Sequence, residues 1–199
     1  FGEASQAADI EIISLMLEAL SIADIERVHI DLAHVGIYNG LIESASLDLA
    51  IQNRLFDALS RKSIPELDVI AEQSQHSKEI ILLIRDIANL SGGVEALDKI
   101  RDSVERLNVK FSSAIVGAIE ELQAIIALIQ QRFPMVNIGV DFCELRGYNY
   151  HTGILFSAYS LDYGHALAKG GRYDGVGKGF DRQSESATRP ATGFSADLK

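Results

Sequence analysis

The chain has 199 residues, a length that suits one sizeable domain or a core with a smaller insertion. Hydrophobic residues make up 47% of it and the mean hydropathy is +0.11, which indicates a soluble globular protein and excludes a disordered one. The net charge of −10 argues against a nucleic-acid partner, because proteins bind phosphate backbones largely through Lys and Arg. The apolar runs are far shorter than the ~20 residues that span a bilayer, so we expect no membrane partner.

The cysteine content and the first residues indicate where the protein works. Cys143 is the only cysteine, which excludes an internal disulfide and a cysteine-based zinc cluster and fits a reducing cytoplasm. It lies in the strand-like sequence VDFCEL, which favours a buried packing thiol. No basic and apolar leader follows Phe1, and an opening FGEASQ without methionine is typical of a piece of a longer protein. We therefore expect a cytoplasmic localisation.

Residues 1–45 predict the first part of a mixed core. Apolar residues recur at helical spacing over 5–20. Residues 27–35 alternate apolar and polar side chains, which is typical of a half-buried strand. Gly36 ends this strand, and a short helix is expected over 37–44.

Residues 46–108 predict several helices and contain no convincing strand. The sequence SIPE matches a capping box, in which the side chain of Ser63 caps the helix and that of Glu66 reaches back. Two further helices are expected over 77–90 and 94–107. This segment is predicted to be an all-helical insertion.

Residues 109–199 predict the second part of the core. A long helix is expected over 111–132, and Pro134 ends it. Strands are then expected near 135–143, 152–159, 164–171 and 191–196. Consecutive strands with short links favour an antiparallel sheet, because parallel neighbours need a long crossover. The predicted fold class is α+β, an antiparallel sheet flanked by helices.

A group of polar and aromatic residues follows the strand expected at 135–143. The guanidinium of Arg146 could bind a carboxylate or a phosphate, or could pair with Glu144 at the surface. In an extended segment Tyr148 and Tyr150 would share one face and His151 the other. These rings could line a pocket or pack in the core.

The sequence GGRYDG follows at 170–175. Paired glycines at a strand end permit close approach of a ligand or another backbone. The alternative is a tight turn in which Arg172 and Asp174 are paired. The sequence is neither a phosphate-binding loop nor a dinucleotide fingerprint. No histidine pair has the short helical spacing of zinc ligands, so we expect no cofactor and no metal.

The ordered motifs RGYNYHTG, GGRYDG and RPATGFSADL resemble those of the histidyl-tRNA synthetase family, which has the class II synthetase catalytic fold. In that family the first motif typically reads RGLDYYTG and the second GGGRYDGL. The resemblance covers nearly the whole chain and includes a helical insertion at the same place. It implies a chain that lacks the N-terminal part of the core.

Departures from the synthetase pattern fall on the motifs themselves. The synthetase Asp is Asn149, its second Tyr is His151, the first Gly of its triple is Lys169, and its Glu after the aromatic is Ser157. The motifs RGYxYHTG and GFSADL are instead similar to the regulatory subunits of ATP phosphoribosyltransferase, a paralogous group that does not aminoacylate.

The resemblance implies a non-catalytic subunit needed for the first step of histidine biosynthesis and involved in histidine feedback. Its expected partner is the short-form catalytic subunit, in a hetero-octamer, and the intact protein is expected to dimerise and to bind histidine. The alternative is a fragment of a divergent histidyl-tRNA synthetase catalytic domain.

The resemblance also implies a histidine pocket and no catalytic residue. Arg146 would face the histidine carboxylate, Tyr173 would reach the imidazole, and His151 would stand where the synthetase tyrosine meets the amino group. The complete set of expected ligand-binding residues is Arg146, Tyr150, His151, Gly170, Gly171 and Tyr173.

Overall fold

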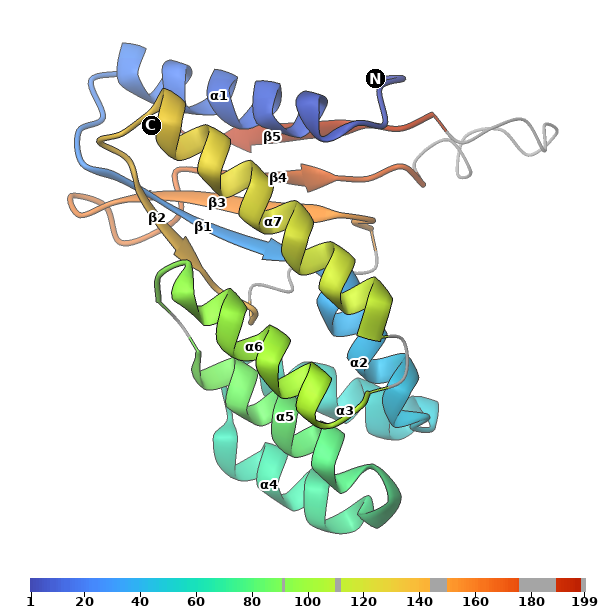
Figure 1. Cartoon of the computed structure of the whole chain (residues 1–199). Coiled ribbons are helices and arrows are strands. Elements are labelled where there is room, and N and C mark those ends of the chain that lie inside the picture. The colour runs from blue at the N-terminus through green and yellow to red at the C-terminus, as the bar shows by residue number, and fades with distance from the viewer. Residues whose placement is uncertain (91, 110–111, 144–149, 176–188, 198–199) are drawn as a thin grey trace, which may run out of the picture.

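A computed structural model describes residues 1–90, 92–109, 112–143, 150–175 and 189–197 of the chain (Figure 1). In the first part of the chain the elements are α1 (Gln6–Ile22), β1 (Val28–His34), α2 (Val35–Ala45), α3 (Leu49–Ser60), α4 (Ile64–Gln73) and a short 3-10 helix (Gln75–Ser77). The second part holds α5 (Lys78–Asn89), α6 (Glu95–Arg106), α7 (Ser112–Arg132), β2 (Asn137–Val140), β3 (Ile154–Ser160), β4 (Ala168–Arg172) and β5 (Thr192–Ala196). The α+β prediction is confirmed.

The five strands form one sheet in the order β2-β1-β3-β4-β5. All neighbouring pairs are antiparallel except β1 and β2, which are parallel. The sheet is thus antiparallel as predicted, apart from this one parallel pair. The chain between β1 and β2 runs through α2 to α7, which is ample length for the crossover that parallel neighbours require.

The register of the strands gives the sheet two unlike faces. Side chains of directly paired residues project from the same face, and successive residues of a strand alternate. One face carries Ile30, Leu32 and Phe156, all fully buried. Helices α1 and α7 lie side by side across this face (Figure 1). We call it the covered face, and the opposite one the open face.

Most predicted helices lie within two or three residues of the expected positions, but the capping box is wrong. Helix α4 begins at Ile64, as the sequence indicates, yet the side chain of Ser63 makes no capping hydrogen bond. The carboxylate of Glu66 instead accepts a hydrogen bond from Arg61 at 2.7 Å. Arg61 thus binds the Glu66 side chain that the capping box would require.

Helix α7 is long and apolar enough to cross a membrane by length and composition alone. Its apolar stripe, however, is buried inside the protein at Ile115, Ile119, Leu122, Ile126 and Ile129. The helix contacts α1, α2, α6 and β1. These contacts are those of the central helix of a packed core.

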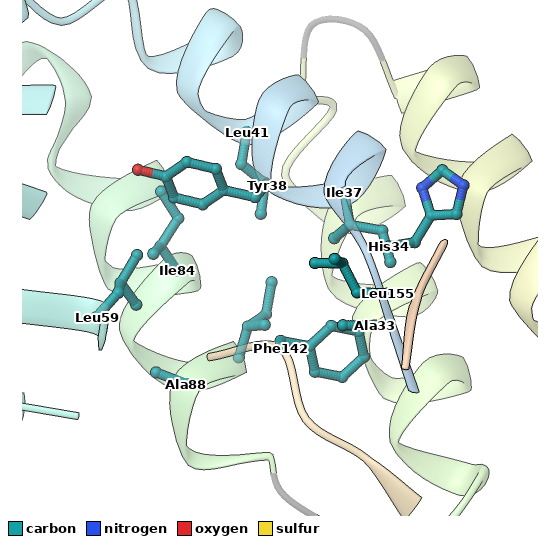
Figure 2. A pocket seen from close by; sticks show the side chains of 11 residues that line it. Ala33, His34, Ile37, Tyr38, Leu41, Leu59, Ile84, Ala88, Phe142 and Leu155 are labelled. Carbon is teal, nitrogen blue, oxygen red and sulfur yellow. The ribbon is translucent and has the colours of Figure 1, made fainter. Parts of the chain in front are cut away.

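Helices α3 to α6 gather at one end of the molecule (Figure 1) but share a single hydrophobic core with the sheet. Figure 2 shows the junction, where Leu59 and Ile84 face Tyr38 of α2 and Phe142. Lys62 also forms a 3.0 Å ion pair with Asp141, just after β2. The boundaries 1–45, 46–108 and 109–199 remain predictions.

Candidate functional site

The sheet carries a cavity of about 420 Å³ at β3, β4 and β5. This volume lies within the ~300–1,000 Å³ typical of small-molecule sites. Its lining consists of Tyr150, His151, Leu155, Phe156, Ser157, Lys169, Gly170, Tyr173, Gly193, Phe194 and Ser195. The cavity in Figure 2 measures only about 20 Å³ and is lined mainly by apolar side chains, so it has room for little more than one water molecule. Cavities of about 480 to 540 Å³ lie elsewhere on the protein, but the cavity of about 420 Å³ is lined by the motif residues Tyr150, His151 and Tyr173, which makes it the candidate binding site.

Aromatic rings form one wall of the candidate site. The rings of Tyr150 and Tyr173 are stacked, with centroids 5.3 Å apart and an interplanar angle of 22°. The imidazole of His151 meets the Tyr150 ring edge-to-face at 5.6 Å. Tyr150 is 53% exposed, which places this wall at the mouth of the cavity. Planar ligands stack well on such rings.

Three glycines explain how these rings come so close to the sheet. On the open face, a Cβ at Gly171 would lie 2.6 Å from Cδ2 of His151, and one at Gly193 would lie 2.7 Å from the Tyr173 hydroxyl. On the covered face, a Cβ at Gly170 would lie 2.5 Å from Cζ of Phe156. The two adjacent glycines of β4 therefore leave room for rings on opposite faces of the sheet, because successive residues of a strand alternate.

Hydrogen bonds join the three segments that carry the cavity wall. The amide of Thr152 donates to the carbonyl of Arg172 at 2.8 Å, and the amide of Asp174 donates to the Thr152 hydroxyl at 3.0 Å. The amide of Tyr173 donates to the carbonyl of Ala191 at 2.8 Å. The amide of Ala191 in turn donates to Oδ1 of Asp174 at 3.0 Å. The backbone around Tyr173 is thus hydrogen-bonded to the segment at Thr152 on one side and to the segment at Ala191 on the other.

A buried ion pair supports this wall from the covered face. Nε and Nη2 of Arg172 both donate to Oδ2 of Asp9 on α1, at 3.0 and 2.8 Å. The two side chains are 7% and 0% exposed. Burial raises the pKa of the Asp9 carboxyl, and the hydrogen bonds from Arg172 act in the opposite direction. Arg172 also pairs with Asp174 at 3.4 Å, as the tight-turn alternative anticipated.

The charge of the cavity differs from that of the chain. Lys169 and His151 line it, and none of its described lining residues is an Asp or Glu. The hydroxyls of Ser157 and Ser195 come from the strands on either side of Lys169. A site with a cation, hydroxyls and aromatic rings can bind a small polar or anionic molecule.

Four of the six expected ligand-binding residues line the cavity: Tyr150, His151, Gly170 and Tyr173. Gly171 lies beneath His151 and outside the lining. Arg146 lies outside the described residues. Sequence motifs missed the contribution of β5, whose Gly193, Phe194 and Ser195 reach the cavity. The alternation within β5 was the available signal, but only the register with β4 shows which side chains face the site.

The remaining histidines lie away from the cavity. His29 pairs with Asp31 at 2.7 Å on the open face, and His34 lies 3.6 Å from Glu121. Figure 2 shows the His34 ring turned toward α7, and this imidazole lowers the pKa of the Glu121 carboxyl. Within the described ranges we find no group of three metal-ligating side chains.

Cys143 has the environment that the sequence predicts for a packing thiol. It is 7% exposed, and its Sγ lies 3.7 Å from the carbonyl oxygen of Ala88. Burial raises the pKa of its thiol to about 11. The thiol is therefore protonated near neutral pH and a poor nucleophile.

The sequence profile of the histidyl-tRNA synthetase family matches residues 1–199. An ATP phosphoribosyltransferase regulatory subunit from Marinobacter nauticus is 46% identical over 199 residues, which is all of this chain and 48% of the relative. One from Hahella chejuensis is 44% identical over the same residues, 47% of that relative. The chain thus spans about half the length of the curated relatives it matches.

Solved structures show the same fold. An ATP phosphoribosyltransferase regulatory subunit/histidyl-tRNA synthetase from Bacillus halodurans superposes with a TM-score of 0.83 at 23% identity, over 99% of this chain and 49% of that one. A chain of the ATP phosphoribosyl transferase (HisG:HisZ) complex from Thermotoga maritima gives a TM-score of 0.73 at 16% identity, over 100% of this chain and 63% of that one.

Proposed function

The chain belongs to the histidyl-tRNA synthetase family, and from that premise we propose that it is part of a regulatory subunit of ATP phosphoribosyltransferase. The whole protein would be needed for the first step of histidine biosynthesis, the condensation of ATP with phosphoribosyl pyrophosphate. Catalysis would lie in a partner, the short-form catalytic subunit, and the protein would work in the cytoplasm.

The observation that carries this proposal is the identity of 43–46% to relatives named as regulatory subunits, which extends over all 199 residues. The matched region covers the residues around the cavity, where the chain departs from the synthetase pattern. The likeness to a chain of a HisG:HisZ complex supports a partner subunit through the fold.

The cavity supports a role in binding rather than in aminoacylation. Lys169 and Ser157 line it at the positions where the resemblance expects a glycine and a glutamate. The exchange of a carboxylate for a hydroxyl removes an acceptor for a ligand amino group, and the exchange of glycine for lysine adds a charged side chain. We propose that histidine, as the feedback signal, binds in this altered cavity.

Phosphoribosyl-ATP formation tests the function. A short-form catalytic subunit from the same source is assayed with and without the full-length protein that contains this chain. We expect activity only when both are present, and inhibition when histidine is titrated in. Full activity of the catalytic subunit alone, or no activation by the folded full-length protein, would overturn the proposal.

The alternative is a divergent histidyl-tRNA synthetase, which the family match and the shared fold favour. It predicts formation of histidyl-adenylate by the full-length protein. ATP–pyrophosphate exchange that depends on histidine would support this alternative. We expect no such exchange, because the cavity has lost the carboxylate and the aromatic hydroxyl at Ser157 and His151.

A further inference from the structure

Lys169 occupies a distinctive position on the open face of the sheet. It is paired with Ser157 of β3 on one side and with Ser195 of β5 on the other. Directly paired residues project from the same face, so the side chain of Lys169 projects between those of Ser157 and Ser195 along one row. All three residues line the cavity.

The ammonium group of Lys169 has no ion pair or hydrogen bond with any of the described residues. Lys62 and Lys78 differ, because they pair with Asp141 at 3.0 Å and with Glu72 at 2.6 Å. The nearest carboxylate in the row is that of Asp31, on the far side of Ser157. It accepts a hydrogen bond from His29 at 2.7 Å and so already has a partner.

The surroundings of Lys169 favour a negatively charged guest. The described lining of the cavity holds Lys169 and His151 but no acidic side chain, although the whole chain carries a net charge of −10. Ser157 is only 2% exposed, so its hydroxyl is shielded from bulk water. An ammonium in such a recess attracts anions more strongly than one on an open surface.

We propose that the cavity binds an anionic group of its ligand, a carboxylate or a phosphate, through the ammonium of Lys169. The hydroxyls of Ser157 and Ser195 donate the flanking hydrogen bonds, and the rings of Tyr150 and Tyr173 cover the uncharged part of the ligand. This inference rests on the proposed role of the cavity as a ligand site. The anion is either the α-carboxylate of an amino acid such as histidine or a phosphate group.

Calorimetry on the full-length protein tests the inference with three probes. The probes are histidine, histidinol, which lacks the carboxylate, and inorganic pyrophosphate. Lys169→Met keeps most of the side-chain volume and removes the charge. Lys99→Met, at an exposed position of α6, is the control for the change in net charge. We expect Lys169→Met to lower the affinity for the anionic probe at least tenfold and Lys99→Met to leave that affinity unchanged.

The probes separate the two sources of the anion. If the anion is a carboxylate, the wild-type protein binds histidine much more tightly than histidinol, and Lys169→Met abolishes that preference. If it is a phosphate, pyrophosphate binds the wild-type protein and loses affinity in the variant. Equal affinities of wild type and Lys169→Met for every probe would overturn the inference but leave the cavity as a ligand site. Failure of the wild type to bind any probe would overturn both the inference about Lys169 and the proposal that the cavity is a ligand site. The proposed regulatory function is tested separately, by activation of the catalytic subunit.

Discussion

The two faces of the sheet differ in how their charged side chains are partnered. The covered face is apolar where it meets α1 and α7, as at Ile30 and Phe156, and its charged residue Arg172 is fully paired with acidic partners. The open face carries a row of polar side chains made of Asp31, Ser157, Lys169 and Ser195, and Lys169 there has no partner among the described residues.

This difference separates packing from function. Burial explains the apolar core residues of the covered face, and the guanidinium of Arg172 there holds α1 against β4. Burial does not explain a cation that lines a cavity with hydroxyls and aromatic rings, since water would solvate the same ammonium better. Residues that packing does not require are the candidates for recognition.

The largest expected effect is on the covered face. Asp9→Ala leaves the buried guanidinium of Arg172 without its main partner, and we expect a loss of about 3–5 kcal/mol in the free energy of unfolding. Urea denaturation measures it, with Asp9→Asn as a second variant if Asp9→Ala does not fold. Asp162→Ala is the control, because its pair with Arg27 is more than half exposed, and such pairs contribute about 0–1 kcal/mol. Equal losses for both pairs would contradict the assigned role of Asp9.

Glycine substitutions compare the two faces within adjacent strands. A Cβ at Gly170 would collide with the carbonyl of Gly193 and the Phe156 ring, so Gly170→Ala should destabilise by about 1–3 kcal/mol. A Cβ at Gly193 would meet the Tyr173 hydroxyl, the far end of a side chain that can move. Gly193→Ala should therefore destabilise less and alter ligand binding more.

Gly164→Ala is the control for these two substitutions, because a Cβ there has open space. Thermal unfolding and calorimetry with histidine measure stability and binding separately. A larger loss of stability in Gly193→Ala than in Gly170→Ala would show that the faces do not differ as described.

On the open face, Tyr173→Phe removes one hydroxyl from the cavity wall and leaves the stacked ring. If histidine occupies the cavity, its affinity should fall by about 0.5–1.5 kcal/mol, the net contribution of one hydrogen bond. Calorimetry measures the affinity, and Tyr163→Phe, outside the cavity, is the control. An unchanged affinity would place the histidine site elsewhere.

The smallest effect concerns Glu121 on α7, near His34. The imidazole lowers the pKa of this carboxyl below its ordinary value, so its contribution to stability is present above the ordinary pKa and is lost as the pH falls through the lowered one. We expect Glu121→Gln to cost about 1 kcal/mol or less near neutral pH, and this cost to disappear once the pH has fallen below the lowered pKa. Urea unfolding at several pH values measures the difference.

Local sequence patterns predicted most elements of the fold because hydrophobic periodicity reflects which face each element buries. The helix stripe over 111–132 and the alternation over 27–35 correspond to α7 and β1. The capping box failed because Glu66 pairs with Arg61, a contact that depends on how the preceding turn folds. The strand expected over 135–143 ends at Val140, because Asp141 accepts a hydrogen bond from the amide of Cys143 and turns the chain.

The sequence by itself determined the α+β class, the buried thiol of Cys143 and the aromatic and glycine residues of the candidate site. Only the tertiary structure decided that β1 lies between β2 and β3, since strand order depends on contacts far apart in the chain. It also decided that Gly170 and Gly171 serve opposite faces and that Lys169 lies between Ser157 and Ser195. A strand's own pattern gives two alternating faces, but pairing with its neighbours decides which side chains meet across the sheet.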